Sequence, residues 1–429
     1  MPRTVLALVL LALAAVATAD PAPAAAPPMT ALRAGRLLDV ASGTVRTDQL
    51  IVVQGSRIVA VGPAASTPVP AGARLLDLSG QTVLPGLIDT HTHITSDPTT
   101  PPYHHYGLSA PRRALKGARF ARDTLLAGIT TVRNVGAQQF TDVALRDAIN
   151  AGDVIGPRML VSGPAIGITG GHCDDNLLAP EYNERADGVA DGPDAVRAMV
   201  RRNIKYGADL IKYCGTGGVF SKGDTPGAQQ FTPEEVAALI NEAHLAGRRV
   251  AVHAHGADGI KVAIRAGVDT VEHASLIDEE GLELAKKHGT WLSMDIYNSE
   301  YTQSEGPKRG ELEEFLKKDR DIAQAQRDNF RKAVQKGIKL TMGTDAGVYR
   351  HGDNAKQLAW MVRYGMTPMQ AIQAATKVGA EALGLEKVVG QLAPGYSADI
   401  IAVAADPLAD VSALEHVAFV MKDGVVYKQ

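Results

Sequence analysis

Cysteine and aromatic side chains are scarce in this sequence of 429 residues, and neither positive nor negative charge is in large excess. Lysine and arginine total 44 against 47 aspartate and glutamate residues, and the basic residues are scattered along the chain. A chain without a basic patch lacks the electrostatic footprint of a nucleic-acid-binding protein, so we expect no nucleic-acid partner. The sequence also lacks a repeat with a period of about 20 to 50 residues, which excludes solenoid and propeller folds.

Long apolar runs are missing too, with one short exception near the start. A basic residue precedes an unbroken apolar run from Val5 to Val16. This run of about 12 residues is too short to cross a bilayer as a helix, and the small-x-small pattern after it is typical of a signal-peptidase site. We predict a cleaved export signal at 1–19, a flexible Pro/Ala linker at 20–29, and a periplasmic or secreted mature protein without membrane attachment. The alternative is an uncleaved anchor.

Only two cysteines occur, Cys173 and Cys214. Export would place them in an oxidising compartment, where a disulfide can persist. A disulfide needs Cα atoms within about 7 Å of each other, and the sequence does not show that distance. The pairing therefore stays open, and neither thiol is predicted to take part in catalysis.

Material for a large core is abundant, because 45% of the residues are hydrophobic. Both chain ends have the pattern of β-strands. The segment "IVVQGSRIVAVGP" holds two β-branched runs joined by Gly-Ser, and "VAFVMKDGVVYKQ" contains an Asp-Gly turn; both are hairpin signals. We predict that residues 30–83 and 389–429 together form one small β-sandwich.

The middle of the chain, residues 84–388, alternates short apolar strands with helical stretches. Eight such alternations over about 300 residues predict an α/β fold, a (β/α)8 TIM barrel. The predicted strands are "GLIDTHTH", "ITTVRNVG", "RMLVSG", "DLIKYCG", "RVAVHAHG", "DTVEHAS", "TWLSMDI" and "KLTMGTDA".

Two predicted helices begin with a capping box, at Thr232 and Thr367, where proline and then Glu or Gln follow the threonine. The second of these helices is predicted to run as far as Gly384. Two connections are long, at 165–205 and 296–323. The first contains "GITGGHCDDN", which is glycine-rich and polar, and we predict that it is an active-site loop.

Histidines gather at the ends of the predicted strands. The first strand ends with His91 and His93, and alternate residues of a strand face the same side. The carboxyl ends of TIM-barrel strands form the catalytic face, and imidazole and carboxylate are zinc ligands. We therefore predict a metal centre at this face. Its further candidates are His253 and His255 on the fifth strand, His273 on the sixth and Asp345 on the eighth.

The fourth strand carries Lys212 inside an apolar run. Burial disfavours an ammonium and leaves a neutral amine, which can capture CO2 and become a carbamate able to bridge two metals. The alternative is a lysine whose stem packs on the barrel rim. Nearby, Arg133 could contact an anionic substrate or form a buried salt bridge, and Tyr213 is expected to face outward and pack.

The order of these residues is similar to that of the metal-dependent amidohydrolase superfamily with a binuclear centre, and the resemblance covers residues 30–429. The segments "GADLIKYCGTGGVFS", "VAVHAHGADGIKVAIRAGVDTVEHAS" and "LTMGTDAG" resemble, more narrowly, the branch that contains Xaa-Pro dipeptidases, carboxypeptidase-like dipeptidases and ochratoxin-hydrolysing amidases. Imidazolonepropionase is a more distant relative. Relatives commonly form homo-oligomers, and the resemblance implies this for the present chain.

The resemblance also implies which residues hold two divalent metal ions, expected to be Zn²⁺. The implied ligands are His91, His93 and Asp345 for one ion, His253 and His273 for the other, and carboxylated Lys212 as the bridge.

Asp345 and Lys212 are the implied catalytic residues. The two ions would generate hydroxide from a bridging water. Asp345 would take the water's proton and later deliver it to the leaving nitrogen. His172 and His255 would bind the substrate's α-carboxylate; the alternative is that these two histidines only support the site.

These implications predict an exported hydrolase that cleaves an amide or peptide bond adjacent to a free carboxylate in a small molecule. Xaa-Pro dipeptides and N-acyl amino acids such as ochratoxin A fit this description. One alternative is a hydrolase of cyclic amides such as imidazolones, which the export signal disfavours. The other is a non-catalytic scaffold, which is disfavoured because all six ligand positions are filled.

Overall fold

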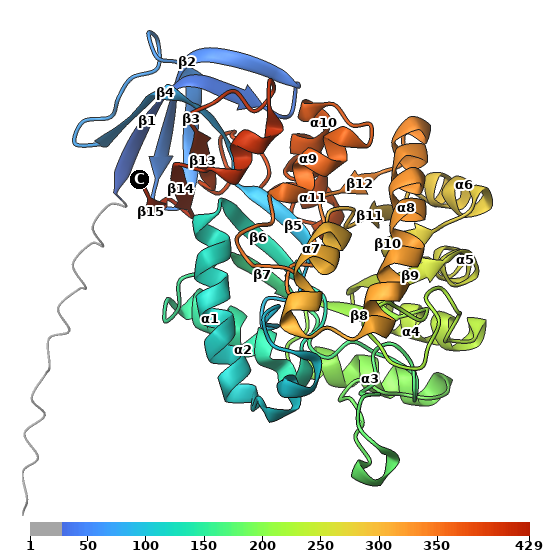
Figure 1. Ribbon diagram of the computed structural model, residues 1–429. Helices are drawn as coiled ribbons and strands as arrows, with labels where there is room; N and C mark the ends of the chain where they lie inside the picture. Colours follow the sequence, from blue (N-terminus) through green and yellow to red (C-terminus); the bar gives the residue numbers. More distant parts are fainter. Residues whose placement is uncertain (1–27) are drawn as a thin grey trace, which may run out of the picture.

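The computed structural model describes residues 28–429 (Figure 1). The predicted export signal at 1–19 lies outside the described residues, as does the predicted linker at 20–29 except for its last two residues. Within residues 28–429, no helix is both long enough and apolar enough to span a membrane.

Strands from both chain ends share one seven-stranded sheet, which is consistent with the predicted β-sandwich built from both ends. Its order is β15-β14-β13-β4-β1-β2-β3, and β1 and β4 pair in parallel whereas the other neighbours are antiparallel. One core cluster combines Leu32 and Ile51 from the N-terminal part with Ile400 from the C-terminal part, each 0% exposed. The strands are β1 (Met29–Asp39), β2 (Thr44–Gln54), β3 (Arg57–Pro63), β4 (Arg74–Pro85), β13 (Ile400–Val403), β14 (Phe419–Lys422) and β15 (Val425–Lys428).

Eight short strands form the interior of the large domain, one at each of the predicted places. They pair in parallel in two groups, β5-β6-β7 and β12-β11-β10-β9-β8. Their bounds are β5 (Leu87–Thr92), β6 (Ile129–Asn134), β7 (Arg158–Val161), β8 (Leu210–Cys214), β9 (Arg249–Gly256), β10 (Thr270–Leu276), β11 (Trp291–Ser293) and β12 (Leu340–Thr341).

The two groups of strands are linked to each other at both edges. Ile166, beyond the end of β7, forms a bridge with Tyr213 of β8. At the other edge Thr92 of β5 forms a bridge with Ala346, beyond the end of β12. Because both edges are bridged, the eight strands are connected in a ring, which is consistent with the predicted (β/α)8 barrel.

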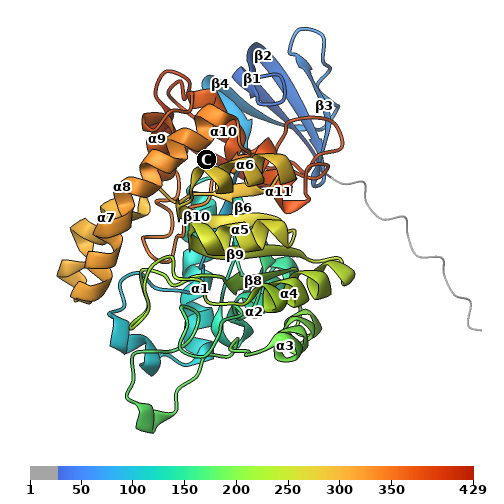
Figure 2. The same ribbon diagram turned by 90° about the vertical axis from the view of Figure 1, so that its right-hand side faces the viewer.

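Helices cover the outside of this ring (Figure 1, Figure 2). Both predicted capping boxes are confirmed, because the threonine side chain and the third helical residue satisfy each other's backbone N–H groups at the starts of α4 and α10. The helices are α1 (Ala110–Leu126), α2 (Thr141–Ala151), α3 (Pro193–Lys205), α4 (Pro233–Leu245), α5 (Ala257–Arg265), α6 (Glu279–His288), α7 (Asn298–Glu305), α8 (Glu313–Lys336), α9 (Lys356–Arg363), α10 (Pro368–Ala374) and α11 (Lys377–Leu383), with short 3-10 turns η1 (Pro102–Gly107), η2 (Gln138–Phe140), η3 (Pro180–Tyr182), η4 (Pro307–Arg309) and η5 (Val411–Glu415).

The helix that we predicted to run unbroken to Gly384 is interrupted between α10 and α11, which corrects that prediction. Thr376, in the interruption, has φ −137° and ψ −100°, outside the helical region. The break frees a carbonyl group for the barrel, since the carbonyl oxygen of Ala375 accepts a hydrogen bond from the backbone N–H of Ile88 in β5 at 2.7 Å. The helix is therefore broken at the point where its backbone forms a hydrogen bond with a barrel strand.

Candidate metal centre and active site

The predicted metal ligands come together at the carboxyl ends of the barrel strands. Most of them are buried: the exposed fraction is 1% for His91, 2% for Lys212, 4% for His253, 6% for His273 and 6% for Asp345. His93 is partly exposed. All of these except His91 line a cavity of about 280 Å³, as do the predicted substrate-binding residues His172 and His255.

His91 and His93 are held by their Nδ1 atoms so that both Nε2 atoms face Asp345. Nδ1 of His91 lies 3.0 Å from Oε2 of Glu272, and Nδ1 of His93 lies 3.1 Å from the carbonyl oxygen of Gly136. Both Nε2 atoms lie 3.3 Å from Oδ1 of Asp345. Metal-binding imidazoles use their second nitrogen in this way, because the hydrogen bond fixes the ring and its tautomer. This geometry fits one metal site.

A second group of three histidines, His253, His255 and His273, lies beside the first. One ligand atom from each lies within 4.8 Å of the others. Nδ1 of His273 lies 2.8 Å from Oδ1 of Asp295, and Nδ1 of His255 lies 2.8 Å from Oγ of Ser275. The carboxylate beside His273 orients that ring, as Glu272 orients the ring in the first group.

Two ring nitrogens in the site are buried without a hydrogen bond: Nε2 of His253, and Nε2 of His91, whose 3.3 Å contact with Oδ1 of Asp345 lacks hydrogen-bond geometry. An unpartnered buried polar atom costs free energy and requires an explanation. A divalent cation would provide one, since imidazole and carboxylate donors match the preferences of Zn²⁺. The residues present therefore fit a metal centre.

The backbone is strained at two of the predicted ligands. The φ angle is 68° at His273 and 57° at Asp345, in the left-handed region that costs a non-glycine residue about 1–3 kcal/mol. At His273 the pairing of β10 with β9 also shifts its register. Strain of this kind persists only where the surrounding structure imposes it, and it is concentrated at functional sites. Here it accompanies two side chains turned into the cavity.

Lys212 projects into the cavity from β8. Burial lowers the pKa of its amine to about 8, although the carboxylates of Glu272 and Asp345 oppose that shift. The neutral amine is the form that can react with CO2. The next residue, Tyr213, is 0% exposed and packs edge-on against Phe231 with ring centroids 5.8 Å apart, so it faces outward as strand alternation predicts.

Arg133 forms the buried salt bridge that was one of its two predicted roles. Its Nη2 lies 2.6 Å from Oε1 of Glu272, its Nη1 donates to Oγ1 of Thr270 at 2.8 Å, and it does not line the cavity. Burial acts to raise the pKa of Glu272, but the charge of Arg133 and the hydrogen bond from His91 hold that pKa well below its usual range. The carboxylate behind His91 is thus kept ionised.

Three residues that support the site were not identified in the sequence: Glu272, Asp295 and Asn298. Asn298, in α7, donates to Oδ2 of Asp345 at 3.1 Å and to Oδ2 of Asp295 at 3.0 Å. Glu272 had a usable signal, because a carboxylate within a buried strand requires a charged or hydrogen-bonded partner. Asp295 had the same signal, because it lies in the predicted strand "TWLSMDI". Asn298 had none, since it lies in the long connection after that strand.

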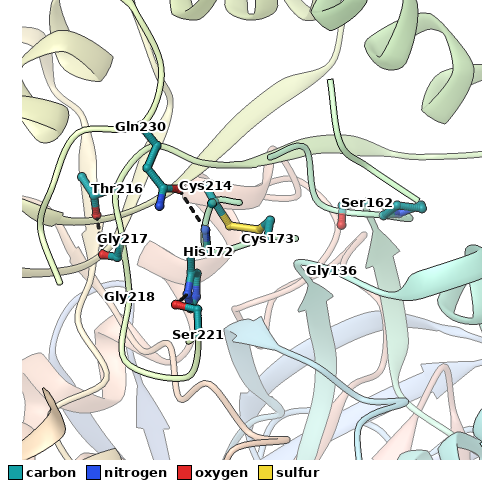
Figure 3. The surroundings of a disulfide bond; sticks show 12 residues. Gly136, Ser162, His172, Cys173, Cys214, Thr216, Gly217, Gly218, Ser221 and Gln230 are labelled. Atoms are coloured by element: carbon teal, nitrogen blue, oxygen red, sulfur yellow. Dashed lines mark hydrogen bonds between the residues drawn. A yellow bond between two sulfur atoms is a disulfide. The ribbon is translucent and has the colours of Figure 1, made fainter. Parts of the chain in front are cut away.

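The predicted active-site loop lies beside the cavity and is linked covalently to β8 (Figure 3). Cys173 and Cys214 form a disulfide with Cα atoms 5.9 Å apart, which settles the pairing that the sequence left open. His172, next to Cys173, stacks on the ring of His253 with centroids 4.0 Å apart. The loop thus brings His172 against a predicted metal ligand.

The sequence model of the protein family described as "Amidohydrolase family" matches residues 82–427 of this chain. The chain belongs to the amidohydrolase family. Family membership confirms the resemblance and makes the chain a hydrolase acting on C–N bonds.

Within the amidohydrolase family, this chain is similar to several named proteins. The ochratoxinase of Aspergillus niger is 35% identical over 372 residues, which are 81% of this chain and 75% of that protein. Its crystal structure superposes with a TM-score of 0.82 and 29% identity over a longer stretch, 94% of this chain and 96% of the ochratoxinase. The crystal structure of a Xaa-Pro dipeptidase with bound methionine in the active site gives a TM-score of 0.85 and 38% identity over 94% of this chain and all 100% of the dipeptidase. An imidazolonepropionase of Rhizorhabdus wittichii is 26% identical over 382 residues, 82% of this chain and 87% of that protein.

Proposed function

We propose that this amidohydrolase uses two divalent metal ions to cleave an amide or peptide bond next to a free carboxylate. One observation carries the proposal: five histidines, a lysine and an aspartate converge on one cavity, in a chain similar over 94% of its length to a Xaa-Pro dipeptidase. Its similarity to ochratoxinase supports the same substrate class.

The proposed ligands divide into two sets, His91, His93 and Asp345 for one ion and His253 and His273 for the other. When bound, the ions would supply Lewis-acid activation of the attacking water and of the scissile carbonyl. Lys212 would join the two sets. Its neutral amine forms a bond to the carbon of CO2 and releases one proton, which gives a carbamate with two oxygens.

Asp345 is the proposed proton carrier. Its Oδ1 faces two imidazoles and its Oδ2 accepts a hydrogen bond from Asn298, so the carboxylate is held in one orientation. It would accept a proton from the attacking water and deliver that proton to the leaving nitrogen. His172 and His255, whose ring centroids lie 4.0 Å and 4.7 Å from that of His253, would bind the substrate's carboxyl group.

A substrate library tests the proposal. The zinc-loaded protein is incubated with dipeptides, N-acyl amino acids, the C-terminal amides of both, and cyclic amides, and the released amine is measured. We expect hydrolysis of compounds with a free carboxylate next to the cleaved bond. Hydrolysis confined to cyclic amides would contradict the proposal and would favour an activity like that of the imidazolonepropionase relative.

Export and self-association complete the proposal. The disulfide between Cys173 and Cys214 supports export, because such bonds persist mainly in oxidising compartments. Cell fractionation tests export, and the expected result is a mature chain that starts after residue 19. Light scattering tests the homo-oligomer that the family resemblance implies.

A further inference from the structure

We propose that the wall of the cavity built by α7 and α8 binds the α-ammonium group of the substrate, with Asp319 as the counter-ion. The inference rests on the proposed function, which admits both dipeptides and N-acyl amino acids. A dipeptide carries an ammonium group on the carbon next to the scissile carbonyl, and an N-acyl amino acid does not. The wall therefore predicts a preference for dipeptides.

The polar residues of this wall are buried and line the cavity of the candidate metal centre. The helices α7 and α8 lie side by side (Figure 1, Figure 2) and are joined by side-chain hydrogen bonds. Asp319 and Gln326 stand about two turns apart on α8 and so share one of its faces. The polar lining residues of the wall, each between 4% and 8% exposed, are Asp295, Asn298, Ser299, Asp319 and Gln326.

The two amide side chains of the wall have no hydrogen left for a ligand. Asn298 donates to Oδ2 of Asp295 at 3.0 Å and to Oδ2 of Asp345 at 3.1 Å. Gln326 donates to Oδ1 of Asp295 at 3.0 Å and to the carbonyl oxygen of His273 at 3.3 Å. A side-chain amide has two hydrogens to donate, so both amides are used up within the protein.

The hydroxyl of the wall is used up in the same way. Ser299 donates to Oδ1 of Asp319 at 2.6 Å, and a hydroxyl has one hydrogen. The oxygen of Ser299 can therefore only accept from a ligand. Since carboxylates accept as well, a substrate group that faces this wall must be a hydrogen-bond donor.

Asp319 adds a negative charge without a counter-ion. Its Oδ2 accepts from the amide of Gln303 at 2.6 Å, so both of its donors are neutral, and a carboxylate can accept further hydrogen bonds. Within residues 28–429, no lysine, arginine or histidine forms an ion pair with it. The cations near it on α8 form ion pairs with other carboxylates; they are Lys318, Arg320 and Arg327.

A cationic ligand group would complete this arrangement. A buried carboxylate is costly without a partner of opposite charge, and burial raises the pKa of Asp319 although the hydrogen bonds from Ser299 and Gln303 oppose the rise. An ammonium group brings several hydrogens and the missing charge. Asp319 and Ser299 are therefore the proposed contacts of that group.

The position of the wall indicates which cation binds. Asn298 holds Asp345 of the proposed metal centre, and the next residue, Ser299, binds Asp319, so the wall adjoins the reaction centre. The α-ammonium of a dipeptide is attached beside the scissile carbonyl and must lie near that centre. The ammonium of a lysine side chain instead ends a flexible four-carbon stem. Divalent ions would repel an ammonium nearby, and the charge of Asp319 opposes that repulsion.

The test compares alanyl-phenylalanine with propionyl-phenylalanine, because the two compounds differ only in the ammonium group. The zinc-loaded protein is given each compound, and the released phenylalanine is measured. In the parent protein we expect kcat/KM to be at least about tenfold higher for the alanyl compound, the scale of a hydrogen bond between charged groups. This comparison needs no variant.

Variants then locate the preference. Asp319→Asn removes the charge at nearly constant size, and the ratio of kcat/KM between the two compounds should fall at least about tenfold. Ser299→Ala removes the second acceptor, and the ratio should fall about fivefold, the scale of a neutral hydrogen bond. Asp321→Asn is the matched control, because Asp321 is an exposed aspartate of the same helix paired with Lys317, and its ratio should equal that of the parent protein.

A purely structural role of Asp319 would give a different result. If its carboxylate only joins α7 to α8, Asp319→Asn should lower the melting temperature and leave the ratio of kcat/KM unchanged, which would overturn the inference. Propionyl-lysine, whose single cation is in its side chain, supplies a further control. A loss in Asp319→Asn confined to propionyl-lysine would assign the wall to a basic side chain and overturn the inference too.

Failure of the inference and failure of the proposed function are distinguishable. Equal kcat/KM for alanyl- and propionyl-phenylalanine in the parent protein would overturn the inference alone, since both compounds carry a free carboxylate next to the cleaved bond. Absence of hydrolysis of either compound would contradict the proposed function and the inference with it.

Discussion

Several side chains of the candidate site are held through a specific atom. Glu272 holds Nδ1 of His91, and the carbonyl of Gly136 holds Nδ1 of His93, so both rings direct Nε2 toward Asp345. Asn298 holds the other oxygen of Asp345. Small changes of polarity at these residues should therefore alter chemistry or metal binding without unfolding the protein.

Replacing Asp345 by asparagine removes the proposed proton carrier. An amide cannot accept and return a proton at neutral pH, so Asp345→Asn should lower turnover at least about 10²-fold, the usual scale of general acid–base catalysis. Circular dichroism and the melting temperature should stay close to those of the parent protein. Near-normal kcat in this variant would remove Asp345 from the mechanism.

Replacing Glu272 by glutamine weakens the support of His91. The charge that faces Arg133 and the ring is lost, and loss of such a partner lowers metal affinity by about 10–100-fold. Titration against a chromophoric chelator measures the affinity. Glu283→Gln is the matched control, because Glu283 is an exposed glutamate paired with Lys336. Equal affinities in the two variants would show that Glu272 has no role at the metal.

At the scale of elements, connections between strands bring several side chains of the candidate site to the cavity. The loop before α3 supplies His172, the connection after β8 encloses its ring, and α7 supplies Asn298. Covalent and polar links help to fix these segments. The disulfide of Cys173 is the strongest of these links.

Removing that disulfide should cost both stability and substrate affinity. Cys173 and Cys214 are 41 residues apart, and closing a loop of that length corresponds to about 4 kcal/mol in the chain-entropy model. Denaturant unfolding of a variant with Cys173→Ser and Cys214→Ser should show a loss of up to this size, and KM should rise. Dithiothreitol should reproduce both effects in the parent protein and have none in the double variant. Unchanged KM in reduced protein would show that the loop keeps its place without the bond.

At the scale of the whole molecule, the proposed metal sites connect the two groups of strands. The ligands come from β5, β8, β9 and β10 and from the segment after β12, so both groups of strands contribute. The unfolded chain holds no such arrangement. Binding of the proposed metal ions would therefore be coupled to the pairing of these strands.

Metal removal should therefore lower the melting temperature as well as activity. A free Zn²⁺ concentration of about 100 times Kd stabilises a folded protein by about 2.7 kcal/mol relative to the metal-free state. Calorimetry with and without a chelator measures the shift, and activity should return when Zn²⁺ is restored. Ca²⁺, which prefers oxygen ligands, is the control and should give no comparable shift. A melting temperature independent of Zn²⁺ would contradict the metal centre.

Much of the architecture follows from local patterns. All eight barrel strands and both capping boxes form where the sequence predicted them, because apolar runs and caps depend on neighbouring residues. The unbroken helix to Gly384 was wrong, since the break at Thr376 satisfies a hydrogen bond from β5 that no local pattern reveals. The same limit applied to Asn298, whose partner Asp345 lies 47 residues further along the chain.

The sequence by itself determined which donor residues stand at the ends of which strands, because strand alternation and the common direction of parallel strands place them at one face. Only the tertiary structure decided what each donor contacts. His91 and Glu272 are separated by 181 residues, and no periodicity relates them. Closure of the ring sets that distance, as it sets the disulfide and the enclosure of His172, because such pairs meet only when elements far apart in the chain pack together.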